Sequence, residues 1–219
     1  MITLKDIKNN HEIDTYIRRG DEYLKAMGFT EHGYRHLNLV SHIAGNVLQI
    51  LGYGKRDVEL ASIAGYLHDI GNVISRHDHG AVGGALIYNI LSKMGMDPEE
   101  IAIIVSAVGN HEEEYGQPVN HVAAALILAD KSDVHRSRVR NRDIANFDIH
   151  DRVNYAVERS FLRVDPEKKT IRLELDIDLE ISSVMEYFEI FLVRMMMCRK
   201  AAEFLGCSFG MVINGANLL

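Results

Sequence analysis

A histidine–aspartate pair, His68-Asp69, stands at the end of an almost wholly apolar segment, and Gly71 follows two residues later. The segment, residues 56–69, carries apolar side chains on nearly every face, which is typical of a helix buried at the centre of a domain. A His-Asp pair alone is common in proteins and indicates little. Four further residues of the same two types accompany it, namely His36 upstream and His79, His111 and Asp130 downstream. We therefore expect a fold in which these side chains converge on a metal centre.

Apolar residues recur at helical spacing through most of the first 133 residues, with short connections between the segments. Glycines stand where helices should stop, and Asp97-Pro98 is a typical helix start. No strand is needed to explain this part of the chain, so we expect a bundle of five to seven helices. The predicted helices cover residues 12–27, 33–51, 56–69, 79–94, 98–110 and 120–133, with a shorter one at 149–159.

The pattern changes after residue 160. Residues 170–177 alternate strictly between two kinds of side chain, and together with residues 161–164 they predict a β-hairpin. Ser183 and Glu186 have the spacing of a capping box, which predicts the start of a long amphipathic helix that ends near residue 205. The last segment, residues 207–215, could form a strand that returns to the hairpin.

The predicted fold class is therefore mainly α. We expect a helical domain over residues 1–150 and a small α+β element over residues 151–219, made of the hairpin, the long helix and a possible last strand. The length of 219 residues fits one large domain with a modest appendage.

Composition and charge narrow the possible partners. The formal net charge of −7 predicts no nucleic-acid polymer as a partner, and an anionic substrate would need a local positive centre. The N-terminus has no apolar signal segment, and no apolar run approaches the length of a membrane span. Cys198 and Cys207 fit neither a zinc-finger spacing nor a disulfide framework. We therefore expect a cytoplasmic protein with no membrane partner.

The candidate ligands share one structural property, because each lies at the end of a predicted helix. Side chains at helix ends can converge at one end of a bundle, and imidazole and carboxylate groups bind divalent transition metals well. A hydrolytic centre needs several such ligands from separate elements, together with open positions for water and substrate.

The order and local context of these residues resemble the HD-domain superfamily of metal-dependent phosphohydrolases. The resemblance covers about residues 30–135, and its segments are His36-x-x-x-Val40-Ser41, Leu67-His68-Asp69-Ile70-Gly71, His79-x-x-x-Gly83, His111-Glu112 and Ala129-Asp130. It implies an all-α core and hydrolysis of phosphoester or phosphoanhydride bonds, mostly in nucleotides. The helical domain over residues 1–150 would then be of the HD type.

The resemblance also implies one or two divalent ions per chain, of Fe, Mn, Co, Ni or Zn, with Mg as a further option. It is closer to members that bind two metals, because those carry the additional histidines. One ion would take His36, His68, Asp69 and Asp130. The other would take His79 and His111 and share Asp69 as a bridge.

The remaining predicted roles concern catalysis and substrate binding. Asp69 is assigned as catalytic, because it would lie between the two ions. Lys131, next to Asp130, could contact a phosphate or protonate the leaving oxygen. Three arginines of a basic loop are predicted to bind further phosphates, namely Arg136, Arg138 and Arg140.

The predicted substrate is a small phosphorylated compound, a nucleotide or a dinucleotide. Members that cleave cyclic dinucleotides carry His-His-Glu and Gly-Tyr-Pro motifs, where this chain has Asn110-His111-Glu112 and Tyr115-Gly116-Gln117-Pro118. This departure argues against cyclic dinucleotides and against a third metal. Members that cleave symmetrical dinucleoside tetraphosphates have a comparable ligand count, so dinucleotide polyphosphates are a candidate.

Two other functions stay open, a di-iron oxygenase on the same scaffold and a non-catalytic nucleotide-sensing module that keeps its metal as a structural element. The C-terminal element could cover the active site or build a homodimer. Among the other histidines, His32 could contact substrate, and His77 competes with His79 as a ligand. Four more are predicted to be structural or at the surface, namely His42, His121, His135 and His150.

Overall fold

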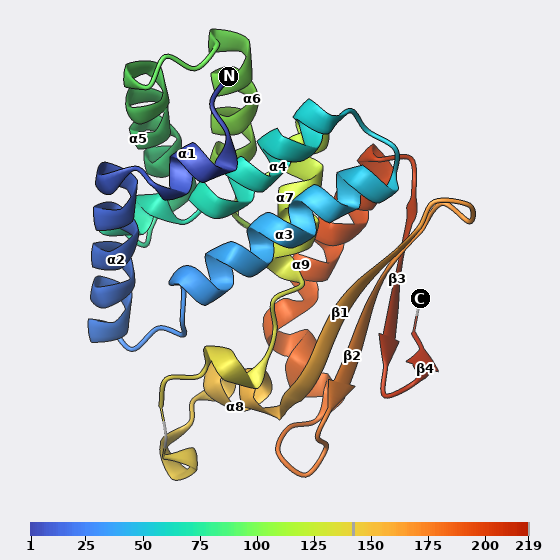
Figure 1. The fold of residues 1–219 in the computed structure, drawn as a ribbon. Coiled ribbons are helices and arrows are strands. Elements are labelled where there is room, and N and C mark those ends of the chain that lie inside the picture. Colours follow the sequence, from blue (N-terminus) through green and yellow to red (C-terminus); the bar gives the residue numbers. More distant parts are fainter. Residues whose placement is uncertain (142, 219) are drawn as a thin grey trace.

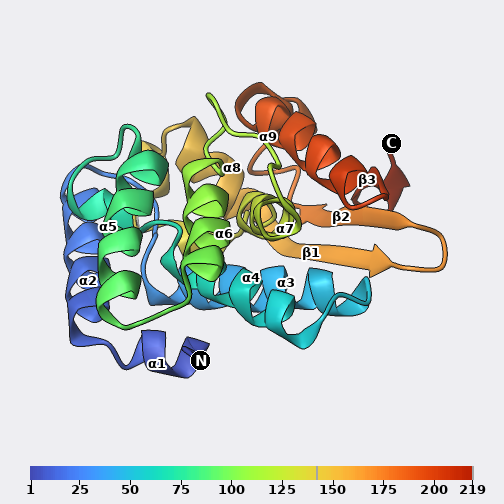
Figure 2. The same ribbon diagram turned by 90° about the horizontal axis from the view of Figure 1, so that it is seen from above.

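Helix α7 (His121–Lys131) runs through the middle of the molecule and is buried along almost its whole length. It contacts α3, α4 and α6 of the helical part and α9 of the C-terminal part. Figures 1 and 2 show these elements arranged around it in the computed structural model, which describes residues 1–141 and 143–218. The apolar sequence on every face of α7 fits this central position.

The helices predicted for the first 133 residues are confirmed, with boundaries shifted by at most two residues. Their observed bounds are α2 (His11–Ala26), α3 (Tyr34–Ile50), α4 (Lys55–Leu67), α5 (His79–Lys93) and α6 (Pro98–Gly109), together with α7. A short additional helix, α1 (Leu4–Lys8), was not predicted, because five residues are too few to show a helical period. A capping box between Thr3 and Asp6 starts it.

Helix α4 ends one residue before the His-Asp pair, and a short 3-10 helix, η1 (Ile70–Val73), follows. Gly65 lets α4 approach α3 closely, because a Cβ there would lie 2.8 Å from Cα of Ser41. Gly71 does the same for the start of α5, since a Cβ there would overlap the backbone oxygen of His79. These two contacts bring the last turn of α4 against the middle of α3, and η1 against the start of α5.

The C-terminal part contains α8 (Ile149–Ala156), β1 (Val157–Asp165), β2 (Thr170–Ile177), α9 (Val184–Phe204), β3 (Ser208–Ile213) and β4 (Ala216–Asn217). The sheet order is β1-β2-β3-β4, with an antiparallel β1–β2 hairpin and β3 parallel to β2. The predicted hairpin and last strand are confirmed. Helix α8 is three residues shorter than predicted, because the sheet already begins at Val157.

The sheet packs on the side of the bundle away from α5, and α9 lies against both α7 and the sheet (Figures 1 and 2). Tyr187, Phe191 and Met195 of α9 are buried in a core that continues from the helical part. The mainly α fold class with a small α+β element is therefore confirmed. The domain boundary at residue 150 stays a prediction.

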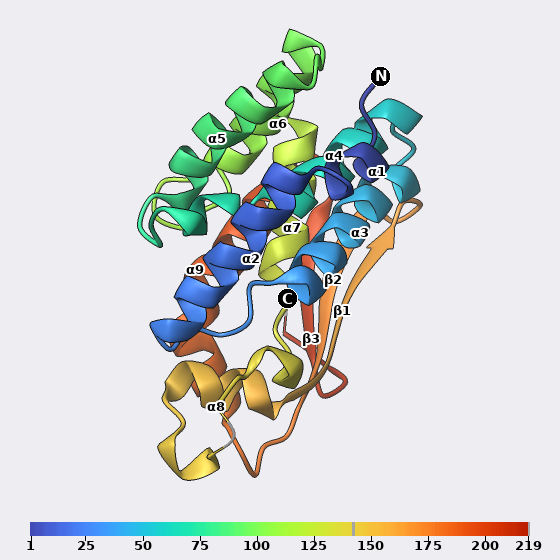
Figure 3. The same cartoon turned by 60° about the vertical axis from the view of Figure 1, so that its left-hand side comes forward.

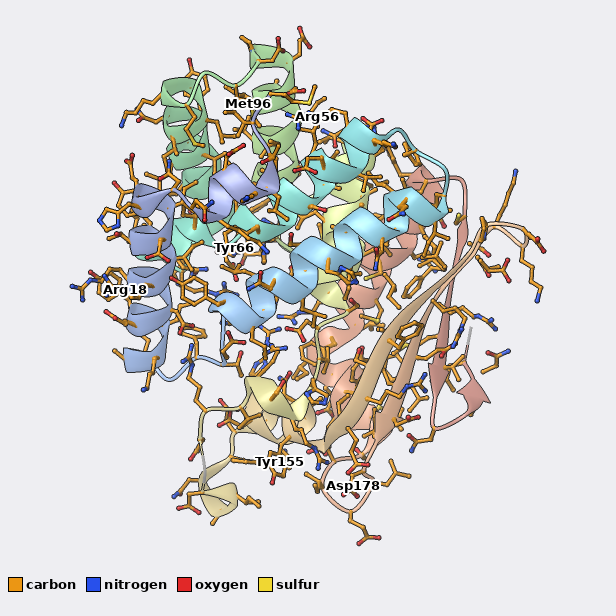
Figure 4. All side chains as sticks on the ribbon, in the orientation of Figure 1. Arg18, Arg56, Tyr66, Met96, Tyr155 and Asp178 are labelled. Atoms are coloured by element: carbon orange, nitrogen blue, oxygen red, sulfur yellow. The ribbon has the colours of Figure 1, made fainter. Side chains whose placement is uncertain are left out.

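Arginine pairs hold peripheral segments of the bundle together. Arg56, at the start of α4 (Figure 4), forms two hydrogen bonds of 2.6 and 2.5 Å with Glu100 of α6 and one with the backbone oxygen of Ile2.

Within the described ranges, none of the helices combines the length and the apolar character needed to cross a membrane. Figure 3 shows α8 below the C-terminal end of α2 and the first turns of α9.

Candidate metal centre

Four histidine side chains direct their Nε2 atoms toward one buried centre. Nε2 of His36 lies 3.2 Å from Nε2 of His68, and Nε2 of His79 lies 3.1 Å from Nε2 of His111. The rings of His68 and His111 meet edge to face between the two pairs, with centroids 5.0 Å apart. All four residues are buried.

Each ring has an oxygen acceptor on its other side. Nδ1 of His68, His79 and His111 lies 2.9, 3.0 and 2.6 Å from a backbone oxygen of the preceding turn, and Nδ1 of His36 lies 2.6 Å from Oδ2 of Asp133. A backbone oxygen can only accept, so the Nδ1 atoms carry the protons and each Nε2 presents a lone pair to the centre. Two lone pairs 3.1–3.2 Å apart repel unless a metal ion or a proton lies between them. Burial lowers the pKa of His79, but Asp69 and Glu112 raise it to about 9, so without a metal this ring carries a second proton.

Two carboxylates complete the set. Oδ2 of Asp69 lies 3.4 Å from Nε2 of His68 and 3.6 Å from Nε2 of His36, whereas its Oδ1 lies 3.2 Å from Nε2 of His79. Oδ1 of Asp130 lies 3.4 Å from Nε2 of His36 and 3.6 Å from that of His68. Asp69 therefore faces one histidine pair with each oxygen, as a bridging carboxylate would.

The donor set fits divalent metal ions. His36, His68 and Asp130 offer ligand atoms within 4.8 Å of one another, and so do His68, Asp69 and His111. Ligand bonds of roughly 2.0–2.2 Å place neighbouring donor atoms about 3 Å apart, as found here. Oδ2 of Asp69 is buried and has no hydrogen-bond partner among the described residues, which is the state expected of an atom reserved for a metal.

Electrostatics match this assignment for three of the ligands. Burial and the neighbouring His79 and His68 lower the pKa of His111 to about 3, so its ring is neutral. Burial would raise the pKa of Asp69 and Asp130, but the neighbouring histidines at Asp69, and Lys131 with His36 and His68 at Asp130, hold both well below the ordinary value of 3.8. Both carboxylates are therefore ionised and available as ligands.

Local structure explains why His79, the first residue of α5, and not His77 of the preceding loop lies at the centre. Asp78 has a left-handed backbone conformation, with φ of 56°, which turns the chain directly before His79. A short polar residue tolerates this conformation better than most. His79 is thereby brought to the centre, whereas His77 is exposed at an adjoining cavity.

Residues around the ligands include several that the sequence reasoning did not single out. Oδ1 and Oδ2 of Asp133 accept hydrogen bonds of 3.2 and 2.7 Å from Arg35. Arg35 therefore fixes the position of the carboxylate that contacts His36. Glu112 lies 3.1 Å from Nδ1 of His79. The position of Asp133 three residues after Asp130, at the same helix end, was a signal that could have identified it.

A small chamber of about 20 Å³ adjoins the ligands, and four basic side chains line it together with the carboxylates of Asp69, Glu113 and Asp130. Its basic residues are Arg76, Lys131, Arg138 and Arg194, and His32 and Glu113 also line it. Nζ of Lys131 lies 2.7 Å from Oδ2 of Asp130 and 3.0 Å from Oε1 of Glu113. Burial opposes the charge on Lys131, but these two carboxylates raise its pKa, so the ammonium group stays protonated.

The three loop arginines predicted to bind phosphate lie in different places. Arg138 is buried at the chamber, where it donates hydrogen bonds to the backbone oxygens of Asp133 and Glu31. Arg136 pairs with Glu158 at 2.8 Å, and Arg140 pairs with Asp21. Neither Arg136 nor Arg140 lines the chamber, and their predicted role stays a prediction.

The histidines outside the candidate ligand set also lie in different places. His32 is at the chamber, where its Nδ1 lies 2.7 Å from the backbone oxygen of Thr30 and its ring centroid 5.6 Å from that of His36. Burial, with Arg138 nearby, lowers the pKa of His32 well below its ordinary value. The others lie away from the ligands, namely His42, His121, His135 and His150.

Two larger cavities adjoin the chamber. The arginine-lined cavity, of about 250 Å³, shares His32, Arg76, Arg138 and Arg194 with it. The acidic cavity, of about 790 Å³, shares Arg76, His79 and Glu113 with it and is also lined by three further carboxylates, Asp78, Glu112 and Glu114.

Comparison with known proteins agrees with this geometry. The model of the HD domain family matches residues 33–135, a range that contains all six candidate ligands. Ribonuclease Y of Bacillus pumilus is 24% identical over 64% of this chain, and that of Oceanobacillus iheyensis is 26% identical over the same share. An uncharacterised protein of Methanocaldococcus jannaschii is 23% identical over 78% of this chain and 74% of its own length.

The chain spans 29% of the length of each of these Ribonuclease Y relatives. The similarity to them is therefore that of a shared segment and not of whole proteins. HD domains bind divalent metals, and the buried His/Asp cluster is a site that fits such ions. Residues 33–135 of this chain match the HD domain family, which confirms the resemblance that the order of histidines and aspartates indicated.

Proposed function

We propose that this protein is a metal-dependent phosphohydrolase that cleaves a phosphoester or phosphoanhydride bond in a small phosphorylated compound, first of all a nucleotide or dinucleotide. One observation carries the proposal. Four of the six candidate metal ligands line a chamber that four basic side chains also line, namely Arg76, Lys131, Arg138 and Arg194. A metal site surrounded by fixed positive charge is suited to phosphoryl groups, which carry negative charge on several oxygens.

The chain's own residues orient the reacting groups. Bound divalent ions would supply an activated water and neutralise charge on the phosphoryl oxygens. Asp69 is held by Nδ2 of Asn72, which donates a hydrogen bond of 2.9 Å to its Oδ1. Asp133 fixes the ring of His36, and the ammonium group of Lys131 fixes Asp130. These contacts hold the ligand atoms in place before substrate binds.

Lys131 acts in this proposal as a fixed positive charge beside the transferred phosphoryl group. Its raised pKa makes the ammonium group a weak acid, so the sequence-based alternative, protonation of the leaving oxygen, has less support. Arg138, buried and held by backbone oxygens, adds a second fixed charge. Such preorganised charges stabilise the transition state without reorganising during the reaction.

The charges of the two cavities support one direction of substrate entry. The acidic cavity is lined by four carboxylates and a single arginine, so it repels phosphate groups. The arginine-lined cavity has three arginines around its boundary with the chamber, and Asp148, Asp151 and Asn154 lie farther along its wall. We propose that phosphorylated substrate enters through the arginine-lined cavity, with its non-phosphorylated part near α8.

The experiment is a hydrolysis panel on the full chain loaded separately with Mn, Fe, Co, Ni, Zn or Mg. Substrates are a generic phosphodiester, mononucleotides, symmetrical dinucleoside tetraphosphates, a cyclic dinucleotide and single-stranded RNA. We expect turnover of a small nucleotide or dinucleotide and no turnover of the cyclic dinucleotide. Metal binding without turnover of any substrate would support the nucleotide-sensing module instead, and oxygen uptake without hydrolysis would support the oxygenase.

RNA is included because two of the relatives are named Ribonuclease Y. The net charge of −7 argues against a polymer, but a single-stranded end could reach the chamber. Cleavage of RNA with no activity on small nucleotides would replace the proposed substrate class.

We also propose a cytoplasmic location, since Cys198 and Cys207 are both free and buried, as is typical of a reducing compartment.

A further inference from the structure

An arginine of the C-terminal element reaches the metal site of the HD domain. Arg194 is on α9, about sixty residues beyond the end of the family match at residue 135. It nevertheless lines both the chamber beside the ligands and the arginine-lined cavity. Packing of α9 against α7, the helix that carries Asp130 and Lys131, brings it there.

Two contacts fix the side chain of Arg194. Its Nε lies 2.7 Å from Oε1 of Glu113, and its guanidinium lies over the ring of Phe191, 4.6 Å from the centroid. Glu113 also holds Lys131, and the two cations keep the pKa of this largely buried carboxyl lowered to about 2 against the effect of burial. Glu113 therefore places two positive charges next to Asp130.

The basic residues of the chamber differ in how many hydrogen-bond donors they can offer to a phosphate group. Lys131 lies between two carboxylates, and the donors of Arg138 are used by backbone oxygens. Nε of Arg194 forms an ion pair with Glu113, and among the described residues its terminal amino groups form neither a hydrogen bond nor an ion pair. These amino groups are the donors with which arginine binds phosphate in a bidentate manner.

We propose that Arg194 binds a phosphoryl group of the substrate at the mouth of the chamber, so that α9 completes the active site of the HD domain. The inference rests on the proposed phosphohydrolase function and adds a residue from outside the HD segment to it. Of the two roles left open for the C-terminal element, it supports covering the site. The HD segment alone would lack this anion ligand.

The test uses inorganic phosphate as the probe and isothermal titration calorimetry as the measurement, with the full chain loaded with Mn²⁺. Arg194→Ala should weaken phosphate binding by about tenfold to a hundredfold, the usual effect of losing a charge-assisted contact. The phosphate affinity of Arg194→Lys should fall between those of wild type and Arg194→Ala, because lysine keeps the charge but not the paired donors. Arg199→Ala is the matched control, since Arg199 is exposed on the same helix and lines neither cavity.

Metal content and circular dichroism of each variant separate loss of phosphate binding from loss of structure. Phosphate affinity of Arg194→Ala within twofold of wild type, at unchanged metal content, would overturn the inference, as would absence of phosphate binding by the metal-loaded wild type. If Arg194→Ala unfolds, Arg194→Lys decides by the same criterion. A phosphate site that depends on Arg194 in a protein without hydrolytic activity would reject the proposed function and leave the assignment of Arg194 intact.

Discussion

Nδ1 of His36 lies 2.6 Å from Oδ2 of Asp133, and the same carboxylate is held by the guanidinium of Arg35. The contact fixes the tautomer of His36 so that its Nε2 faces the centre formed by His68, Asp69 and Asp130. A carboxylate in this position also makes the imidazole a stronger ligand. Asp133 is therefore expected to contribute to metal affinity without touching the metal.

Asp133→Asn should lower metal affinity by about tenfold to a hundredfold, because the amide holds His36 more weakly and removes a negative charge from the ligand's outer side. The measurement is a competition titration with a coloured chelator. Asp176→Asn, a change at an exposed strand residue, is the control. Equal affinities of Asp133→Asn and wild type would show that His36 does not depend on this carboxylate.

Asp69→Asn should lower hydrolysis by at least about a hundredfold. Each carboxylate oxygen of Asp69 faces one histidine pair, and in asparagine one of them becomes an amino group while the other loses its negative charge. Elemental analysis should show less metal per chain than in wild type. The experiment requires wild type that is active in the substrate panel. Full activity of Asp69→Asn would remove Asp69 from both of its predicted roles, the bridge and the catalytic residue.

Removal of metal should destabilise the fold. Without a metal, the Nε2 atoms of His36 and His68, and those of His79 and His111, lie 3.1–3.2 Å apart with at most a proton between them, in a centre that also holds two buried carboxylates. Saturating metal at about a thousand times its Kd should raise the free energy of unfolding by about 4 kcal/mol. Urea unfolding with excess metal and with chelator measures this, and a midpoint that does not respond to metal would argue against binding at the buried cluster.

Gly71→Ala should destabilise the protein by about 1–3 kcal/mol and should lower metal affinity, because the new Cβ would overlap the backbone oxygen of His79. Gly109→Ala is a matched control. No atom lies within 4 Å of a Cβ at Gly109, which belongs to α6, so this change should be neutral or stabilising by up to about 1 kcal/mol. Similar unfolding midpoints for the two variants would contradict the close contact at Gly71.

Glu186 should make stability depend on pH in the acid range. Hydrogen bonds from Arg152 and from the capping box at Ser183 lower its pKa from the ordinary value of 4.5 to about 2. The folded pKa is below the unfolded one, so this contribution is present above pH 4.5 and is lost as pH falls toward 2.

Thermal unfolding of Glu186→Gln and wild type across this range tests the effect. The variant should be less stable at neutral pH, and the difference should shrink as the pH falls below 4.5. Glu189→Gln, at an exposed position of the same helix, should follow wild type throughout. A difference between Glu186→Gln and wild type that does not change with pH would reject this role of the charge.

Local signals in the sequence were enough to predict the elements, and the resemblance to the HD-domain superfamily pointed to the candidate ligands. Helical periodicity predicted α2–α7, strict alternation predicted β2, and a capping box predicted the start of α9. The order of histidines and aspartates pointed to six ligands, and the structure brings these six side chains to one centre. Such signals arise within a few residues of chain, so a single sequence displays them.

Tertiary structure alone decided which charged residues surround the ligands. Glu113 and Arg194 are 81 residues apart, and Asp133 and Arg35 are 98 residues apart. Nothing in the local sequence distinguishes Arg194 at the chamber from Arg136 and Arg140, which pair with Glu158 and Asp21 elsewhere. The packing of α9 on α7 and the position of the loop after α7 determine these partners, because long charged side chains are placed by the elements that carry them.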